Sequence, residues 1–162
     1  MKKLITLLAL LIATTQLFAQ EQLSPRVKAK GDGVEISYGQ PSKRGRVIFG
    51  DLVPYNELWR AGANEATEVT FTKDVNFGGK PVNEGTYTLF VIPKEKEWTV
   101  ILNSQSGQWG SYDYEKYKVK NVAEITVPVY TVNDEEEKLT YSISKGNIKI
   151  EWDHTGVSIP LR

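Results

Sequence analysis

The sequence predicts an all-β domain, an antiparallel β-sandwich of the jelly-roll kind with roughly seven to eight short strands. Two observations support this prediction. Apolar and polar residues alternate with a period of two in several short segments, which is typical of strands with one buried face. Clusters of turn-forming residues separate these segments at close intervals, and no window after residue 20 keeps a helical period.

The expected strands follow one another along the whole chain after its first 32 residues. In chain order they are residues 33–39, 68–75, 86–92, 98–103, 122–131, 138–144, 147–152 and 157–161. In the first of them Val34, Ile36 and Tyr38 share one face. Pro128 interrupts one of the later strands, which indicates a sheet edge or a bulge.

Turn-forming segments connect these strands. Short turns separate 86–92 from 98–103 and 138–144 from 147–152, so we expect each of these two pairs to form a hairpin. Residues 76–81 contain two adjacent glycines and a proline, and we expect a turn there. A single helical turn is expected at most, and its best candidate is the segment 55–59 after Pro54.

The first 19 residues have the features of a secretory signal peptide. Lys2 and Lys3 precede an apolar run at residues 4–13, which is too short to remain in a bilayer as a spanning helix. Leu17-Phe18-Ala19 is an acceptable cleavage site. We therefore expect an exported protein, periplasmic or extracellular, with one β-sandwich domain at residues 20–162 and no membrane insertion.

Composition excludes several kinds of chemistry. The chain has no cysteine, so disulfides, thiolate metal sites and cysteine nucleophiles are ruled out. Basic and acidic residues number 20 each, which gives no sign of nucleic-acid binding. His154 is the single histidine, so a zinc site would depend mainly on carboxylates, and no pattern presents a serine nucleophile to it. We expect no metal and no cofactor, and no catalytic residue can be assigned.

One long connection differs from the rest of the chain. Residues 40–67 have little strand pattern and are rich in arginine, glycine and aromatic residues. Connections of this length inside a small domain usually carry function or are held by specific side-chain bonds.

Within and around this connection the sequence resembles a known family. The residues that carry the resemblance are Ser24-Pro25, Tyr38, Pro41-Ser42, Gly45-Arg46, Leu52-Val53-Pro54-Tyr55, Trp59-Arg60-Ala61-Gly62-Ala63-Asn64-Glu65-Ala66-Thr67, Gly85-Thr86-Tyr87, Trp98-Thr99-Val100 and Trp109-Gly110. They resemble domain-of-unknown-function family 2911, a family of exported bacterial proteins. The resemblance covers nearly all of the chain after the signal peptide and implies no activity, substrate or cofactor.

The same connection contains the candidate ligand-binding residues. Arg46 and Arg60 offer guanidinium donors, Asn64 an amide and Glu65 a carboxylate, and such a group binds carboxylates, phosphates or sugar hydroxyls. Aromatic residues supply a flat apolar face. The complete candidate set is Tyr38, Arg46, Trp59, Arg60, Asn64, Glu65 and Trp109. The leading hypothesis is a binding or accessory module of the cell envelope with a small anionic or sugar-like ligand.

Three alternatives remain open from the sequence. In the first, Arg60 pairs with Glu65 or Asp51, and the motif at residues 59–67 only fixes the long connection. The second is a hydrolase acting on glycans, with Asp51 and Glu65 as acid and base. The third is a structural subunit of an outer-membrane assembly, which would show a large exposed apolar patch.

Overall fold

A computed structural model describes residues 23–162, and the signal peptide expected at residues 1–19 lies outside this range. Strands form most of the described chain. They are β1 Arg26–Gly31, β2 Val34–Gly39, β3 Thr67–Phe71, β4 Val75–Phe77, β5 Lys80–Val82, β6 Gly85–Pro93, β7 Glu97–Asn103, β8 Asn121–Ser144 and β9 Asn147–Pro160. A short helix, α2 Tyr114–Tyr117, and a 3₁₀ turn, η2 Lys118–Lys120, precede β8.

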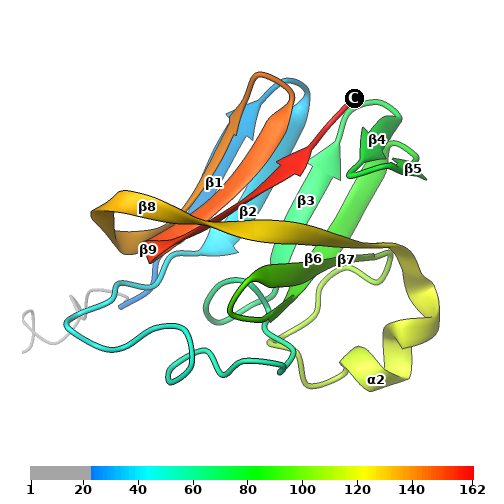
Figure 1. Cartoon of the computed structure of the whole chain (residues 1–162). Helices are drawn as coiled ribbons and strands as arrows, with labels where there is room; N and C mark the ends of the chain where they lie inside the picture. The colour runs from blue at the N-terminus through cyan, green and yellow to red at the C-terminus, as the bar shows by residue number, and fades with distance from the viewer. Residues whose placement is uncertain (1–22) are drawn as a thin grey trace, which may run out of the picture.

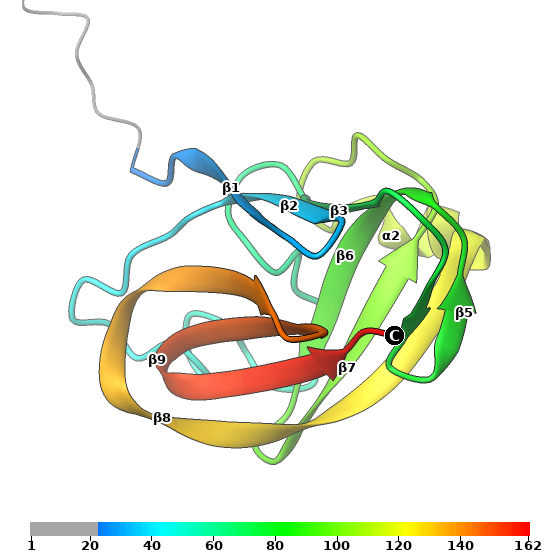
Figure 2. The same cartoon turned by 90° about the horizontal axis from the view of Figure 1, so that it is seen from above.

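Seven strands form one antiparallel sheet in the order β1-β2-β3-β6-β7-β8-β9, and β4 and β5 form a separate hairpin. The all-β antiparallel prediction is therefore confirmed. A single curled sheet forms two layers, because β8 pairs with β7 through residues 121–128 and with β9 through residues between 129 and 144. Figure 1 shows β8 crossing in front of the sheet, and Figure 2 shows β8 and β9 curling back beneath β1 and β2.

The curl brings the two ends of the sheet together. A Cβ atom added to Gly31 at the end of β1 would lie 2.7 Å from the carbonyl oxygen of Ile143 in β8. Such a contact is too short for a side chain, so glycine permits the two strands to approach. The apolar faces of all seven strands then enclose one continuous core.

The local predictions succeeded where the pattern was strong. Val34, Ile36 and Tyr38 are buried on one face of β2 as expected. The hairpins β6–β7 and β8–β9 are confirmed, the second turning at residues 145–146. Pro128 pairs opposite Glu97, the first residue of β7, at the point where β8 changes partner. It lies in an inner strand of the sheet and no register shift falls beside it, so the sheet edge or bulge expected at Pro128 is not found there.

Other predictions were wrong in detail. The segment 55–59 is not helical, and the short helix α2 lies elsewhere, before β8. The turn expected within residues 76–81 is present but covers only residues 78–79, and the residues on either side of it form β4 and β5. The expected strands at 122–131 and 138–144 are parts of one long strand, β8. No helix within residues 23–162 is long and apolar enough to cross a membrane.

An aromatic cluster closes one end of the core. Trp98 of β7 and Trp152 of β9 are almost completely buried. Phe49 from the long connection packs against Trp98, with ring centroids 4.9 Å apart, and Trp59 stacks on Trp152 at 6.2 Å. The long connection is therefore part of the core, because its aromatic residues complete this cluster.

Candidate functional site

The connection between β2 and β3, residues 40–66, is fixed to the sheet by backbone hydrogen bonds. Its first part runs beside β8, where the Leu139 N–H donates to the Pro41 carbonyl at 3.0 Å and the Lys43 N–H donates to the Glu137 carbonyl at 2.7 Å. Its later part pairs with β6, because Trp59 and Val91 exchange two hydrogen bonds. Figure 1 shows this segment looping below the sheet. These hydrogen bonds therefore fix the positions from which the side chains of the connection project.

The chain reverses sharply in the middle of the motif. Ala61 and Asn64 have positive φ values of 53° and 62°, which are uncommon for residues other than glycine. The Ala61 carbonyl accepts hydrogen bonds from the buried Tyr141 hydroxyl at 2.7 Å and from Thr67 Oγ1 at 2.9 Å. These bonds stabilise the reversal. As a result, residues 59–60 and residues 65–66 contribute to two different pockets.

We call the first pocket the arginine pocket. It has a volume of about 270 Å³, and its walls include Arg46, Leu52, Trp59, Arg60 and Trp152. No carboxylate is among the described residues that line it. The pocket therefore combines two guanidinium groups with an aromatic wall.

Neither arginine of this pocket has a counter-ion among residues 23–162. Arg46 donates through Nε to the Lys43 carbonyl at 3.0 Å and through Nη2 to the Ser42 carbonyl at 2.7 Å, which orients its side chain. Arg60 Nε is buried and has no hydrogen-bond partner in the described part of the chain. A buried donor left unpaired costs about 1–3 kcal/mol, so the position of Arg60 Nε does not add to the stability of the fold.

We call the second pocket the glutamate pocket. It also has a volume of about 270 Å³, and its walls include Arg26, Glu65, Glu68, Gln108 and Trp109. The loop that carries Gln108 and Trp109 is fixed to the motif by backbone bonds. The Ala66 N–H donates to the Gln108 carbonyl at 3.0 Å, and Glu65 and Trp109 form an isolated β-bridge.

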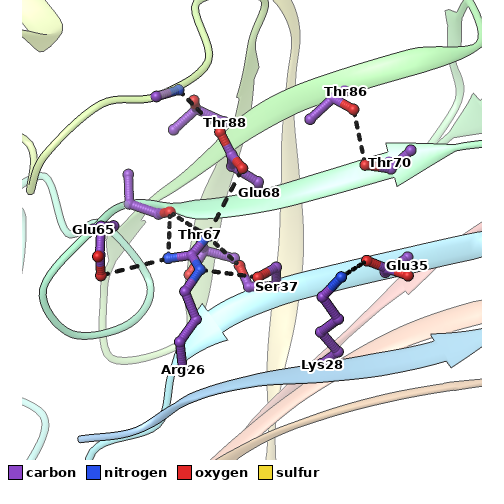
Figure 3. A network of polar contacts seen from close by, with 12 residues as sticks. Arg26, Lys28, Glu35, Ser37, Glu65, Thr67, Glu68, Thr70, Thr86 and Thr88 are labelled. Atoms are coloured by element: carbon purple, nitrogen blue, oxygen red, sulfur yellow. Dashed lines mark hydrogen bonds and ion pairs between the residues drawn. The ribbon is translucent and has the colours of Figure 1, made fainter.

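Arg26 organises the charged groups of the glutamate pocket (Figure 3). Its guanidinium donates to Ser37 Oγ at 2.9 Å and to the Ser37 and Ala66 carbonyls at 3.2 and 3.4 Å. It also lies 3.8 Å from one carboxylate oxygen of Glu65 and 3.8 Å from one of Glu68. Arg26 is thus a partnered arginine, unlike Arg60.

The remaining candidates lie outside the arginine pocket. Tyr38 is buried, and its hydroxyl accepts from the Tyr141 N–H at 3.3 Å and from Gln40 Nε2 at 3.4 Å. Burial raises the pKa of the Tyr38 phenol. Asn64 donates to the Ser24 carbonyl at 3.3 Å, so it connects the motif to the chain before β1. Tyr38 and Asn64 therefore contribute hydrogen bonds within the fold.

The structure thus divides the seven candidates into three groups. Arg46, Trp59 and Arg60 meet in the arginine pocket, and Glu65 and Trp109 meet in the glutamate pocket. The other two residues line neither pocket. Asp51, the partner of Glu65 in the hydrolase alternative, is exposed and also lines neither pocket.

One polar cluster was missed from the sequence. Lys43 Nζ lies 2.7 Å from Glu135 and 2.8 Å from Asp153, and His154 Nε2 lies 4.0 Å from Glu135. Hydrogen bonds to Asp153 and Glu135 raise the pKa of Lys43. The lysine ammonium already provides these carboxylates with a positive charge, so the cluster fastens the connection to β8 and β9. Residues 134–137 form an acidic run in the sequence, but its distance from Lys43 depends on the pairing of the long connection with β8, which the sequence does not show.

Comparison with known proteins gives the family of the chain. A family model described as a protein of unknown function, DUF2911, matches residues 20–161. No curated protein and no solved structure matches the chain. Because the family match spans nearly the whole sequence, the chain belongs to the DUF2911 family, as the motif at residues 59–67 predicts.

Proposed function

We propose that this member of the DUF2911 family is an exported binding domain of the cell envelope whose arginine pocket takes a small organic or inorganic anion. The observation that supports it best is the pair of arginines without counter-ions. Arg46 and Arg60 line one pocket, and neither has a carboxylate partner among the described residues. A carboxylate or phosphate supplies the charge and the acceptor atoms that these groups need.

The geometry of the pocket defines the size of the ligand. Its volume of about 270 Å³ lies just below the range of about 300–1,000 Å³ usual for drug-sized ligands. Leu52, Trp59 and Trp152 contribute apolar surface beside the two arginines. A ligand with one anionic group and a small apolar or flat body matches this combination. The aromatic cluster behind Trp59 keeps the wall rigid, which lowers the cost of ordering the site on binding.

Export is supported by the sequence of the first 19 residues. Two lysines, an apolar run and a small residue at the cleavage position form the pattern of a secretory signal. An exported domain is exposed to ligands of the cell envelope rather than to those of the cytoplasm. Cell fractionation with an epitope tag at the C-terminus tests this part separately: we expect a shortened protein outside the cytoplasm, and a full-length cytoplasmic protein would contradict it.

Thermal unfolding with added anions tests the pocket. Phosphate and acetate are titrated at constant ionic strength, with chloride as the reference salt. We expect at least one of them to raise the melting temperature, because a ligand at a hundred times its Kd stabilises the folded state by about 2.7 kcal/mol. The variants Arg46→Gln and Arg60→Gln should each lose this increase.

Arg44→Gln is the matched control. Arg44 belongs to the same connection, carries the same charge and does not line the arginine pocket. It should keep the full response to the anion. An increase that survives in both Arg46→Gln and Arg60→Gln, or no increase at about 50 mM of either anion, fifty times a Kd of about 1 mM, would rule out the proposed function.

A further inference from the structure

The glutamate pocket differs in chemistry from the arginine pocket and needs a separate explanation. Its two carboxylates and single guanidinium give it one excess negative charge. Trp109 forms part of its wall and is 59% exposed, although large apolar side chains are usually buried. A pocket that presents an exposed indole beside charged groups is not explained by packing.

Hydrogen-bond acceptors remain available in this pocket, whereas most donors of Arg26 are occupied. The Arg26 guanidinium donates to Ser37 and Ala66, and its distances of 3.8 Å to Glu65 and Glu68 are too long for hydrogen bonds. Figure 3 shows Glu65 and Glu68 on two sides of Arg26. One Glu68 oxygen accepts from the Gly107 N–H at 2.9 Å, which fixes that side chain. Glu65 has no comparable bond within the described chain.

Gln108 adds an unused acceptor to the pocket wall. The residue is only 7% exposed, and its Nε2 donates to the Gln105 carbonyl at 2.9 Å, which fixes the orientation of the amide. Its Oε1 is buried and has no hydrogen-bond partner in the described residues. A buried acceptor without a partner costs about 1–3 kcal/mol, so the wall of this pocket is not arranged for stability alone.

We propose that the glutamate pocket binds a neutral sugar ring. Sugar hydroxyls both donate and accept, so they donate to the accessible Glu65 carboxylate. The C–H face of a pyranose is apolar and packs on an exposed indole such as Trp109. Arg26 disfavours an organic cation in the same place, because its guanidinium lies between the two carboxylates. The volume of about 270 Å³ fits a single ring better than a long oligosaccharide within the pocket itself.

Hydrogen bonds fix the segments that form this pocket. Backbone bonds join residues 64–66 to residues 108–110, and the Arg26 network joins both to β1, β2 and β3. Carbohydrate binding is typically weak when a flexible surface must first be ordered, and a fixed pocket lowers this cost. The inference does not depend on the arginine pocket, since the two pockets share no lining residue.

Titration of ¹⁵N-labelled protein with methyl β-glucopyranoside, methyl α-mannopyranoside and N-acetylglucosamine tests the proposal. The chain has four tryptophans, and the Trp109→Phe spectrum identifies the indole N–H signal of Trp109. We expect at least one sugar to shift this signal with saturation, while the signal of Trp59 in the arginine pocket does not move. Glu65→Ala should weaken the binding about tenfold, the loss expected for one charged hydrogen bond.

Tyr112→Ala is the matched control, because Tyr112 is an 80% exposed aromatic residue of the same loop that does not line the pocket. It should bind as the parent does, and Trp109→Ala should not bind. Three results overturn the proposal: no saturable shift at about 50 mM of any of the sugars, binding that survives in Trp109→Ala, or the same shift with tetramethylammonium chloride at equal concentration. The last would identify a cation site.

Discussion

The arginine pocket and the glutamate pocket lie at the two ends of the same short motif, and their arginines differ in their hydrogen-bond and charge partners. In the glutamate pocket, Arg26 is bonded to Ser37 and Ala66 and lies near two carboxylates. In the arginine pocket, Arg60 keeps a buried Nε without a partner in the described chain. Arg26 connects neighbouring strands, whereas the charge of Arg60 has no counter-ion among the described residues. The role of an arginine here follows from its partners.

The tryptophans of the two pockets give the comparison its largest expected effect. Trp59 packs against Phe49, Trp98 and Trp152, and Trp109 is mostly exposed. We expect Trp59→Ala to lower the free energy of unfolding by about 3 kcal/mol, because it leaves a cavity in the aromatic cluster. Trp109→Ala should change it by less than about 0.5 kcal/mol. Urea denaturation measures both free energies. Equal losses would contradict the view that Trp59 is a packed core residue and Trp109 an exposed ligand-binding residue.

The reversal between the pockets gives a smaller effect. Tyr141→Phe removes the hydrogen bond that the buried Tyr141 hydroxyl donates to the Ala61 carbonyl. The Ala61 carbonyl still accepts the hydrogen bond from Thr67 Oγ1. We expect a loss of about 1–2 kcal/mol in the free energy of unfolding. The exposed Tyr112→Phe should show no loss. If Tyr141→Phe is as stable as Tyr112→Phe, the hydrogen bond from Tyr141 to Ala61 does not stabilise the chain reversal.

Lys43 and Arg46 sharpen the comparison within the arginine-rich segment, because only Lys43 has carboxylate partners. Hydrogen bonds to Asp153 and Glu135 raise its pKa in the folded state, so its stabilising contribution is complete below its unfolded pKa of about 10.4 and is lost as pH rises through the folded value. Lys43→Gln should therefore lower the urea midpoint at pH 7, and its difference from the parent should shrink only above about pH 10. A difference that has vanished at pH 9 would contradict this account.

Much of the fold follows from local patterns in the sequence. The alternation of Val34, Ile36 and Tyr38 and the turn at residues 145–146 were sufficient to predict β2 and the β8–β9 hairpin. Strand β1 was missed because its outward face carries Arg26, Lys28 and Lys30, which made the segment look like a polar terminus. The curl of the sheet was also not predictable, since it depends on β8 changing its partner.

The candidate site was predicted as one group and is divided by the structure. The reversal occurs at Ala61 and Asn64, and only Asn64 is of a residue type that commonly adopts a positive φ. The positive φ of Ala61 is not signalled by its residue type. Arg26 and Gln108 were not predicted because they come from β1 and from the loop after β7, and only tertiary structure brings them to Glu65. The pairing of Arg60 with Glu65 or Asp51, one alternative from the sequence, does not form in the described chain, and Glu65 lies near Arg26 instead.

The most direct test of this account compares the free energies of unfolding of Arg60→Met and Arg26→Met in a buffer without polyvalent anions. Methionine keeps most of the aliphatic packing of an arginine and removes its charge and donors. We expect Arg26→Met to lose about 1.5–3 kcal/mol, because it removes hydrogen bonds of a charged group. Arg60→Met should match the parent or exceed it, since it removes a buried unpaired donor. A loss of more than about 2 kcal/mol in Arg60→Met would show that Arg60 is a structural residue and would contradict the account.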